Sequence, residues 1–394
     1  MNFFIDLPRL INRLGVIFLK CIFKKGDVLT MTVSKVSILG AGNGGITAAA
    51  DLSQRGFEVV LFENELFASN LEKIDENGGI FLQEKGEENF IEVHQVTTDI
   101  KEAVKDADVI MLTVPGFAIE SMAEMLAPAV KEEQVIFLNG AGAMGALRFV
   151  NKARSLGIEK NFKIGETNSL TYGTRAFPEE AKVELGLRVK KLFFAAYPAE
   201  ATEELLEICR ELYQCLVPAK NVLHSTMENG NPEVHPGPSL LNAGRIDYSN
   251  GEFYLYKEGI TKHTVRLLRG IEAERIAIGK AFGFELEDAI TSRYNRGYFE
   301  TNEGTLQELF NKSEVYGAIK GPTEVDSRYF TEDISDGLVF WSELGETAGI
   351  ATPNIDAVIT IGGTILERDF YSEGLTLSKL GLTELSVQEL LRKL

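Results

Sequence analysis

Histidine is the side chain best suited to move protons near neutral pH, and this chain has only four. His94 lies in a predicted strand and is expected at the surface, whereas His224 and His263 lie in or near predicted helices. His235 differs, because it stands in the irregular segment ENGNPEVHPGPSLLNAGRI, between two prolines and just before a predicted helix. Segments of this kind often carry functional side chains. His235 is therefore the first candidate for an acid–base group, with a structural polar role as the alternative.

A catalytic histidine usually needs a carboxylate that orients its ring and stabilises its charged form. The segment SRYFTEDISDG offers three, Glu332, Asp333 and Asp336, and Arg328 precedes them. An arginine can bind a carboxylate through two parallel hydrogen bonds. The segment is compatible with a substrate site, and also with a surface turn that carries weak local ion pairs.

A second group of residues indicates a dinucleotide site. Gly40, Gly42 and Gly45 form the pattern G-x-G-x-x-G between a predicted strand, KVSIL, and a predicted helix, ITAAADLSQ. In such a motif the first glycine permits a tight turn, the second lets the backbone approach a pyrophosphate, and the third allows close packing. The helix N-terminus offers N–H groups to the phosphates, and Asn43 is a further candidate contact inside the motif.

The end of the next strand, FEVVLFE, indicates which nucleotide is bound. Glu63 stands there, about twenty residues after the second glycine, where a carboxylate can bind ribose hydroxyls and would repel a 2′-phosphate. No Lys or Arg follows before Lys73, so NAD is expected and NADP is less favoured. The motif alone also allows flavin. Two later strand ends, TVPGF with Pro115 and NGAGAMGA, are expected to border the nicotinamide, or to be ordinary turns.

The elements that must position these residues fall into two groups along the chain. Up to about residue 217, apolar strand runs alternate with helical segments, which is typical of a parallel sheet with helices on both faces. Beyond that point helical periodicity dominates, as in TKHTVRLLRGIEAERIAIGKAFG and in LTELSVQELLRKL at the end of the chain. We predict a dinucleotide-binding domain over residues 31–218 and a helical substrate or catalytic domain over residues 219–394. His235 lies just past the junction, and clefts between domains often bind ligands.

Composition excludes some classes of protein. The chain has 394 residues, which favours two domains, and 40 basic against 58 acidic residues give a net charge of −18, which argues against nucleic-acid binding. Its three cysteines, Cys21, Cys209 and Cys215, show no C-x-x-C spacing. A disulfide framework and a metal site are therefore not expected, and a cytoplasmic location is.

The first thirty residues differ from the rest of the chain. Residues 1–30 are basic, and their apolar positions follow helical spacing, so they could lie on a membrane surface, but charges interrupt the run too often for a spanning helix. Met31 stands just before the first strand of the nucleotide motif, where such domains usually begin. We interpret residues 1–30 as an N-terminal extension outside the fold.

Five segments together resemble the octopine/nopaline (opine) dehydrogenase family: VSILGAGNGG, TVPGF, GETNSLTYGTR, NPEVHPGPSLLNAGRI and DSRYFTEDISDGLVFW. The resemblance runs from Val33 to the C-terminus. It implies an N-terminal α/β domain with a Rossmann-type doubly wound sheet, followed by an all-α domain of the 6-phosphogluconate dehydrogenase-like type. It also implies the NADH-dependent reductive condensation of a 2-oxo acid, such as pyruvate, with the amino group of an L-amino acid to a secondary-amine dicarboxylate, and the reverse oxidation.

The resemblance also implies roles for individual residues. His235 would be the acid–base group and Asp333 its partner, while Arg328 would hold the carboxylate of the 2-oxo acid. Glu166 and Thr167, in the segment GET, would lie on the amino-acid side of the site. The loop NGAGAMGALRF departs from the family pattern, which affects the predicted shape of the amino-acid pocket.

Other functions are compatible with parts of this pattern. A reductase of the ketopantoate reductase or glycerol-3-phosphate dehydrogenase type would share the two-domain plan, although such enzymes typically use a catalytic lysine. A non-enzymatic NAD(H)-sensing protein would need the glycine motif alone, and a membrane-associated variant would use residues 1–30. The expected partners are the small-molecule substrates and, as a further candidate, a second copy of the chain.

Overall fold

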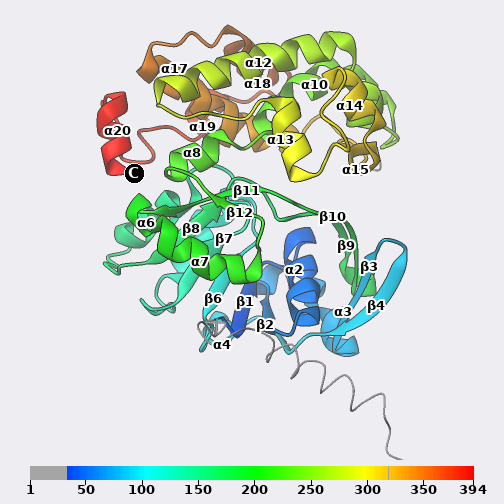
Figure 1. The fold of residues 1–394 in the computed structure, drawn as a ribbon, viewed down its shortest axis with the longest axis vertical. Helices are drawn as coiled ribbons and strands as arrows, with labels where there is room; N and C mark the ends of the chain where they lie inside the picture. The colour runs from blue at the N-terminus through cyan, green and yellow to red at the C-terminus, as the bar shows by residue number, and fades with distance from the viewer. Residues whose placement is uncertain (1–32, 318) are drawn as a thin grey trace, which may run out of the picture. The chain divides into compact units, whose positions relative to one another are not determined.

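The computed structural model describes residues 33–317 and 319–394, so the predicted extension over residues 1–30 lies outside the described residues. Residues Val33–Leu394 belong to one structural unit. In that unit the strands come first along the chain and the helices that follow Pro218 come second (Figure 1). This order agrees with the predicted α/β part followed by an all-α part.

Among the described residues, eight strands form the main sheet, in the order β12-β11-β8-β7-β6-β1-β2-β5. Neighbouring strands are parallel, except that β11 is antiparallel to β8. Its central strands read as continuous apolar runs, such as VIML and VIFL, which is typical of strands buried on both faces. The strands are β1 (Lys35–Leu39), β2 (Glu58–Phe62), β5 (Gln95–Thr97), β6 (Val109–Leu112), β7 (Val135–Leu138), β8 (Lys163–Thr167), β11 (Leu192–Tyr197) and β12 (Leu216–Pro218).

Helices alternate with these strands along the chain, as predicted. Their apolar positions face the sheet, as in α5, where Ile119, Met122, Ala123 and Leu126 are the buried residues. The helices of this part are α2 (Asn43–Gln54), α3 (Ser69–Asn77), α4 (Ile100–Ala103), α5 (Ile119–Leu126), α6 (Gly145–Ser155) and α7 (Thr202–Leu212), with short 3-10 turns at Glu65–Phe67, Gly116–Ala118, Pro178–Glu180 and Ala199–Ala201.

A second, four-stranded sheet has the order β4-β3-β10-β9 and was only partly predicted. The apolar run that begins KVELGLRV predicted a strand and corresponds to β10, but the other three strands were not expected. Of these, β4 reads EENFIE and is almost wholly exposed, so it lacks an apolar alternation. Lys85 and Gly86 join β3 to β4 with positive φ at both residues, as in a tight hairpin turn. The strands are β3 (Gly79–Glu84), β4 (Glu87–Glu92), β9 (Tyr172–Phe177) and β10 (Lys182–Arg188).

The part of the chain after Pro218 is helical, as predicted. The predicted helix over residues 261–283 is α12 (Lys262–Ala281), which Thr261 caps, whereas the C-terminal helix is shorter than predicted because Ser386 caps it. The core contains Phe330, Phe340, Trp341 and Phe370. The other helices are α8 (Val222–Met227), α9 (Asn231–Val234), α10 (Pro236–Leu241), α11 (Ala243–Tyr248), α13 (Ala289–Arg296), α14 (Leu306–Lys312), α15 (Glu314–Gly317), α16 (Arg328–Thr331), α17 (Val339–Ala348), α18 (Pro353–Leu366), α19 (Phe370–Glu373) and α20 (Val387–Lys393), with π-helices η5 (Leu255–Gly259) and η6 (Asp333–Leu338). Within residues 33–317 and 319–394, no helix has both the length and the apolar character needed to cross a membrane.

The prediction that His235 lies in an irregular segment was wrong. Its backbone N–H donates to the carbonyl oxygen of Asn231 at 2.9 Å, so the residue ends α9 and directly precedes α10. Pro232 and Pro236 stand in the first turns of these two helices, where proline is favoured because its missing N–H would have no partner there. The prolines therefore start two short helices and hold His235 at their junction.

The turn between β1 and α2 has the geometry that the glycine motif predicted. Gly40 has φ of +104°, which favours glycine. A Cβ atom on Gly45 would lie 1.7 Å from the carbonyl oxygen of Gly40, so the turn and the helix can pack this closely only without a side chain. A Cβ atom on Gly42 would meet nothing within 4 Å, which leaves open space beside the N-terminus of α2.

We predict that Gly45→Ala destabilises the protein and that Gly42→Ala does not. The new methyl group of Gly45→Ala must displace backbone, which costs about 3 kcal/mol of the free energy of unfolding. Urea denaturation of both variants would measure this difference. Equal midpoints for the two variants would contradict the packing role of Gly45.

Candidate active site

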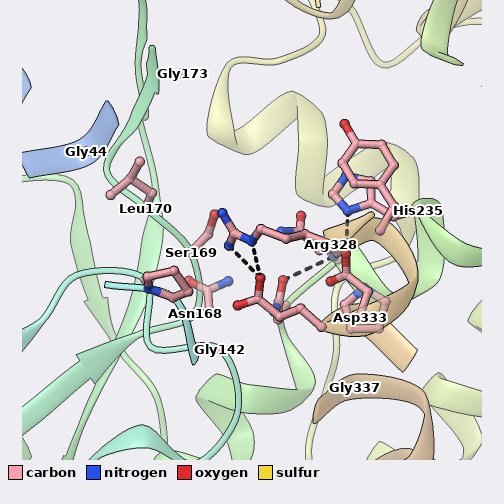
Figure 2. Close-up of a pocket in the computed structure, with 18 of the residues that line it drawn as sticks. Gly44, Gly142, Asn168, Ser169, Leu170, Gly173, His235, Arg328, Asp333 and Gly337 are labelled. Atoms are coloured by element: carbon pink, nitrogen blue, oxygen red, sulfur yellow. Dashed lines mark hydrogen bonds and ion pairs between the residues drawn. The ribbon is translucent and has the colours of Figure 1, made fainter. Parts of the chain in front are cut away.

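His235 and Asp333 lie side by side, with 2.8 Å between Nδ1 of the ring and Oδ2 of the carboxylate (Figure 2). Asp333 is the first residue of the π-helix η6, which packs on α9 immediately before His235. This approach depends on Gly337, because a Cβ atom there would lie 2.3 Å from Cγ of Pro232. The structure thus brings together two residues that the sequence analysis paired.

Three neighbours hold the imidazole of His235 in one orientation. With Asp333 as the acceptor for Nδ1–H, the neutral ring has its lone pair on Nε2. The hydroxyl of Tyr256 lies 2.7 Å from Nε2. Because burial raises the pKa of Tyr256 well above 10, the hydroxyl stays protonated and donates a hydrogen bond to that nitrogen. Tyr329 stacks on the face of the ring, with centroids 4.0 Å apart. The arrangement leaves Nε2 as the nitrogen that can accept or give a proton.

Asp333 is a buried carboxyl group whose charge depends on the ring beside it. Burial raises the pKa of Asp333 above its ordinary value, because a buried carboxylate loses its hydration, and the attraction of the His235 ring opposes that rise. The carboxylate therefore stabilises a positive charge on the imidazole.

One cavity of about 640 Å³ borders both the glycine turn and the His235–Asp333 pair. Residues from both parts of the chain line it. Of the residues predicted to form a site, those that line the cavity are Gly42, Asn43, Pro115, His235, Arg328 and Asp333.

The residues predicted to bind the cofactor take different places around the glycine turn. Gly40 and Gly45 form the turn itself, and Gly42 leaves open space at the N-terminus of α2, an end of a helix that favours anions. Glu63 lies at the end of β2 but does not line the cavity, and its carboxylate accepts the backbone N–H of Ala41 at 2.7 Å. This chain therefore has the open turn, the helix N-terminus and the acid at the end of β2 that a nicotinamide dinucleotide requires.

Asn43 also has a structural contact, since its side-chain oxygen accepts the backbone N–H of Ala176 at 2.8 Å. This contact ties the first turn of α2 to β9.

Arg328 lines the cavity with a side chain that is 64% exposed. Its Nε donates to Glu332 at 2.7 Å, and the other carboxylate oxygen of Glu332 accepts the backbone N–H of Gly116 at 3.0 Å. Figure 2 shows the Arg328 side chain extending from the His235–Asp333 pair toward Asn168 and Ser169. Because Glu332 occupies only part of the guanidinium group, N–H donors of Arg328 remain for a ligand.

Glu166 and Thr167 do not reach the cavity. Both side chains are buried in β8, each 1% exposed, because this strand lies inside the main sheet. Glu166 accepts the backbone N–H of Ala146 at 2.7 Å, and Thr167 accepts that of Gly140 at 3.0 Å. Burial raises the pKa of Glu166 to about 8. In this structure Thr167 supports the loop before α6, part of which lines the cavity, and Glu166 supports the first turn of α6.

Several cavity residues were missed by the sequence analysis, namely Tyr256, Arg293, Arg296 and Tyr329. Tyr329 follows Arg328 inside the segment RYFTED and could have been found there. The two arginines lie one turn apart in SRYNRGY, a pattern that is common on exposed helices and gave no signal.

Two family models match the chain in succession. The model for ketopantoate reductase PanE/ApbA matches residues 36–156. The model for the NAD/NADP octopine/nopaline dehydrogenase, alpha-helical domain, matches residues 218–366, which include His235, Arg328 and Asp333. The similarity to ketopantoate reductases thus runs from β1 to α6, whereas the candidate acid–base pair lies in the octopine/nopaline dehydrogenase match.

Individual relatives align over nearly the whole chain. The opine dehydrogenase of Arthrobacter sp. (strain 1C) is 36% identical over 350 residues, which are 89% of this chain and 96% of the relative. The vitopine synthase of Allorhizobium ampelinum is 26% identical over 358 residues, again 89% of this chain and 96% of the relative. Among solved structures, octopine dehydrogenase in complex with NADH and agmatine has the same fold, with a TM-score of 0.73 at 20% identity over 91% of this chain and 98% of that chain.

The remaining histidines lie away from the cavity. His94 is 52% exposed and 3.4 Å from Glu58, which confirms its predicted surface position, and His263 is exposed on α12. His224 is buried in α8, where its ring stacks on Phe284 with centroids 4.8 Å apart. Burial lowers the pKa of His224 to about 4, because the buried ring resists the positive charge.

We predict that His224 makes stability depend on pH between about 4 and 6.5. Its pKa is lower in the folded state than the ordinary 6.5, so the unfolded chain binds the proton more readily, and stability is lost as the pH falls from 6.5 to about 4. The loss amounts to about 3 kcal/mol at most. Urea unfolding at pH 7.5 and pH 4.5 should show a smaller pH effect in His224→Phe than in the native protein. The exposed His263→Phe serves as the control, and an unchanged pH effect in His224→Phe would refute the prediction.

Proposed function

The chain belongs to the octopine/nopaline dehydrogenase family and is an NAD-dependent oxidoreductase acting on a CH–NH bond, and we propose that His235, held by Asp333, is its acid–base group. The reaction condenses a 2-oxo acid with the amino group of an amino acid and reduces the product with NADH. The observation that carries the proposed role is the 2.8 Å contact between His235 and Asp333, in a cavity that also borders the glycine turn.

His235 serves both proton transfers that the condensation requires. The amine attacks the carbonyl carbon only after it loses a proton, and Nε2 of the neutral ring accepts that proton when the amine takes the place of the Tyr256 hydroxyl. The adduct then expels its hydroxyl group as water, and the imidazolium returns the proton to it. Asp333 stabilises the charged ring between the two steps, while the stacked ring of Tyr329 holds the imidazole in its orientation. Bound NADH supplies the hydride that reduces the resulting carbon–nitrogen double bond.

Arg328 positions the 2-oxo acid in this scheme. Its guanidinium is held by Glu332, which is fixed to the backbone N–H of Gly116 beside Pro115. The remaining N–H donors bind the carboxylate of the 2-oxo acid, so that its carbonyl carbon has one orientation relative to His235.

Further features of the protein belong to the same proposal. We place the boundary between the nucleotide-binding and helical domains at Pro218, where β12 ends, with the extension over residues 1–30 outside both. The unpaired Cys209 and Cys215 support a reducing, cytoplasmic environment. The proposed assembly is a homodimer.

A protein that only senses NAD(H) would have no use for a buried His–Asp pair beside the nucleotide turn, which disfavours that alternative.

We predict that loss of the imidazole abolishes most of the turnover. In His235→Ala, NADH oxidation with pyruvate and a panel of L-amino acids should fall by about 10²- to 10⁴-fold in kcat. Asp333→Asn keeps the shape but removes the negative charge, so kcat should fall by a similar factor. The exposed His263→Ala should retain native activity. Native turnover by a folded His235→Ala protein would exclude the proposed role.

Arg328→Gln should weaken binding of the 2-oxo acid specifically. Loss of a charge-assisted pair costs about 2–3 kcal/mol, so the KM for pyruvate should rise by roughly 30- to 150-fold, whereas the KM for the amino acid should change little. Steady-state kinetics with each substrate varied in turn measures both values. A rise confined to the amino acid would assign Arg328 to the other substrate.

A further inference from the structure

Two buried arginines of α13 line the cavity without a role in the scheme above. Arg293 and Arg296 lie one helical turn apart and are 4% and 6% exposed. A buried guanidinium keeps its charge, so it needs a compensating anion or a full set of hydrogen bonds. How far the protein supplies these partners decides whether the pair can bind a ligand.

Arg293 has an incomplete set of partners. Its NH1 lies 3.5 Å from Glu233, a long distance for an ion pair, and donates to the carbonyl oxygen of Ala289 at 3.1 Å, while its NH2 donates to the carbonyl oxygen of Gly230 at 3.3 Å. Glu233 has a closer partner in Arg275, at 3.0 Å, so one carboxylate serves two guanidinium groups. Among the described atoms, the buried Nε of Arg293 has no hydrogen-bond partner.

The positive charge of Arg296 has still fewer compensating partners. Its NH2 donates to the carbonyl oxygen of Glu228 at 2.5 Å, and none of the ion pairs of the described residues involves it. The acid that acts on it most strongly is Glu228, but burial raises the pKa of that carboxyl group, and its Oε1 accepts the backbone N–H of Glu287 at 3.0 Å. Positive charge therefore remains at this wall of the cavity.

A row of aromatic rings connects this wall to His235. Tyr256 is hydrogen-bonded to Nε2 of His235, and its ring centroid lies 4.3 Å from that of Tyr316. The ring centroids of Tyr316 and Tyr298 are 4.9 Å apart. The charge of Arg293 opposes the rise that burial causes in the pKa of Tyr316. All these tyrosines line the same cavity. An amine at Nε2 can thus belong to a molecule whose anionic group reaches the arginines.

We propose that Arg293 and Arg296 form a subsite that binds a carboxylate of the amino donor. The other anions of the reaction have separate binding groups, since the 2-oxo acid has Arg328 and the pyrophosphate has the open turn at Gly42. This inference rests on the proposed function, because it takes His235 as the place where the amine reacts. The carboxylate is either the α-carboxylate of any amino acid or the side-chain carboxylate of an acidic one.

Kinetics of Arg296→Gln test the subsite. We expect the KM for the amino donor to rise at least tenfold, with changes below about threefold in the KM values for pyruvate and NADH. Arg296→Lys keeps the charge and should restore part of the affinity. Arg245→Gln removes the same charge from an exposed side chain, 46% exposed, and should change none of these values. An unchanged KM for the donor, or a rise for pyruvate or NADH instead, would overturn the proposal.

Three matched donors separate the two sources of the carboxylate. L-Glutamate carries both groups, L-glutamine only the α-carboxylate, and 4-aminobutanoate only the side-chain carboxylate. If the arginines hold the α-carboxylate, the loss in Arg296→Gln appears with glutamate and glutamine; if they hold the side-chain carboxylate, it appears with glutamate and 4-aminobutanoate. A loss of equal size for uncharged primary amines would contradict carboxylate binding.

A binding measurement keeps this test independent of turnover. Trp341 is the only tryptophan and lines the cavity, so its fluorescence reports on ligands there. Titration of the native protein with glutamate in the presence of NAD⁺, which supports no condensation, should give saturable quenching that Arg296→Gln weakens and Arg296→Lys partly restores. If Arg296→Gln does not fold, native protein and Arg296→Lys decide the matter. Quenching without turnover would contradict the proposed function and keep the subsite, whereas no carboxylate-dependent quenching in native protein would overturn the subsite.

Discussion

The hydrogen bond between His235 and Asp333 is the contact on which the rest of the site depends. It joins residues that are far apart in the sequence, and burial of both side chains makes each depend on the other. Two local features make the contact possible: the prolines that start α9 and α10 fix the position of His235, and Gly337 lets η6 reach Pro232. A buried pair of this kind contributes little net stability, so its value lies in the defined orientation of one imidazole.

The same π-helix connects the acid–base pair to the nucleotide-binding sheet. Asp336, three residues after Asp333, binds the buried Arg148 of α6 at 3.0 Å, and Arg148 also binds Glu120 of α5 at 2.7 Å. Glu332, one residue before Asp333, accepts the N–H of Gly116. Successive acids of one short segment therefore hold the ring of His235, the loop after β6 and the helices behind it. This explains how a side chain from the helical part is held in register with a cofactor site formed by the sheet.

The sequence could predict a feature when the residues that form it are close together along the chain. The glycine turn depends on neighbours in the chain, so its spacing predicted both the turn and the close packing of Gly45. The strand β4 left no apolar pattern because it is exposed. Glu166 and Thr167 have side chains suited to a substrate, but whether they face the cavity depends on the position of β8 in the sheet. Arg293 and Arg296 were missed because their burial follows from tertiary packing alone.

The charge of the cavity illustrates why composition is a poor guide to specificity. The chain carries a net charge of −18, which taken alone would favour a basic substrate. In the cavity, however, Asp333 faces His235, Asp336 faces Arg148 and Glu332 faces Arg328, so these acids are already compensated within the protein. Arg296 forms no ion pair with any described residue, although the buried Glu228 attracts its charge. Because fields inside a cavity are screened far less than those at the surface, we expect the incompletely compensated Arg293 and Arg296 to outweigh the surface acids in selecting a ligand. If these arginines bind the amino donor as proposed, selectivity for that donor is a property of the helical part, because both arginines belong to α13.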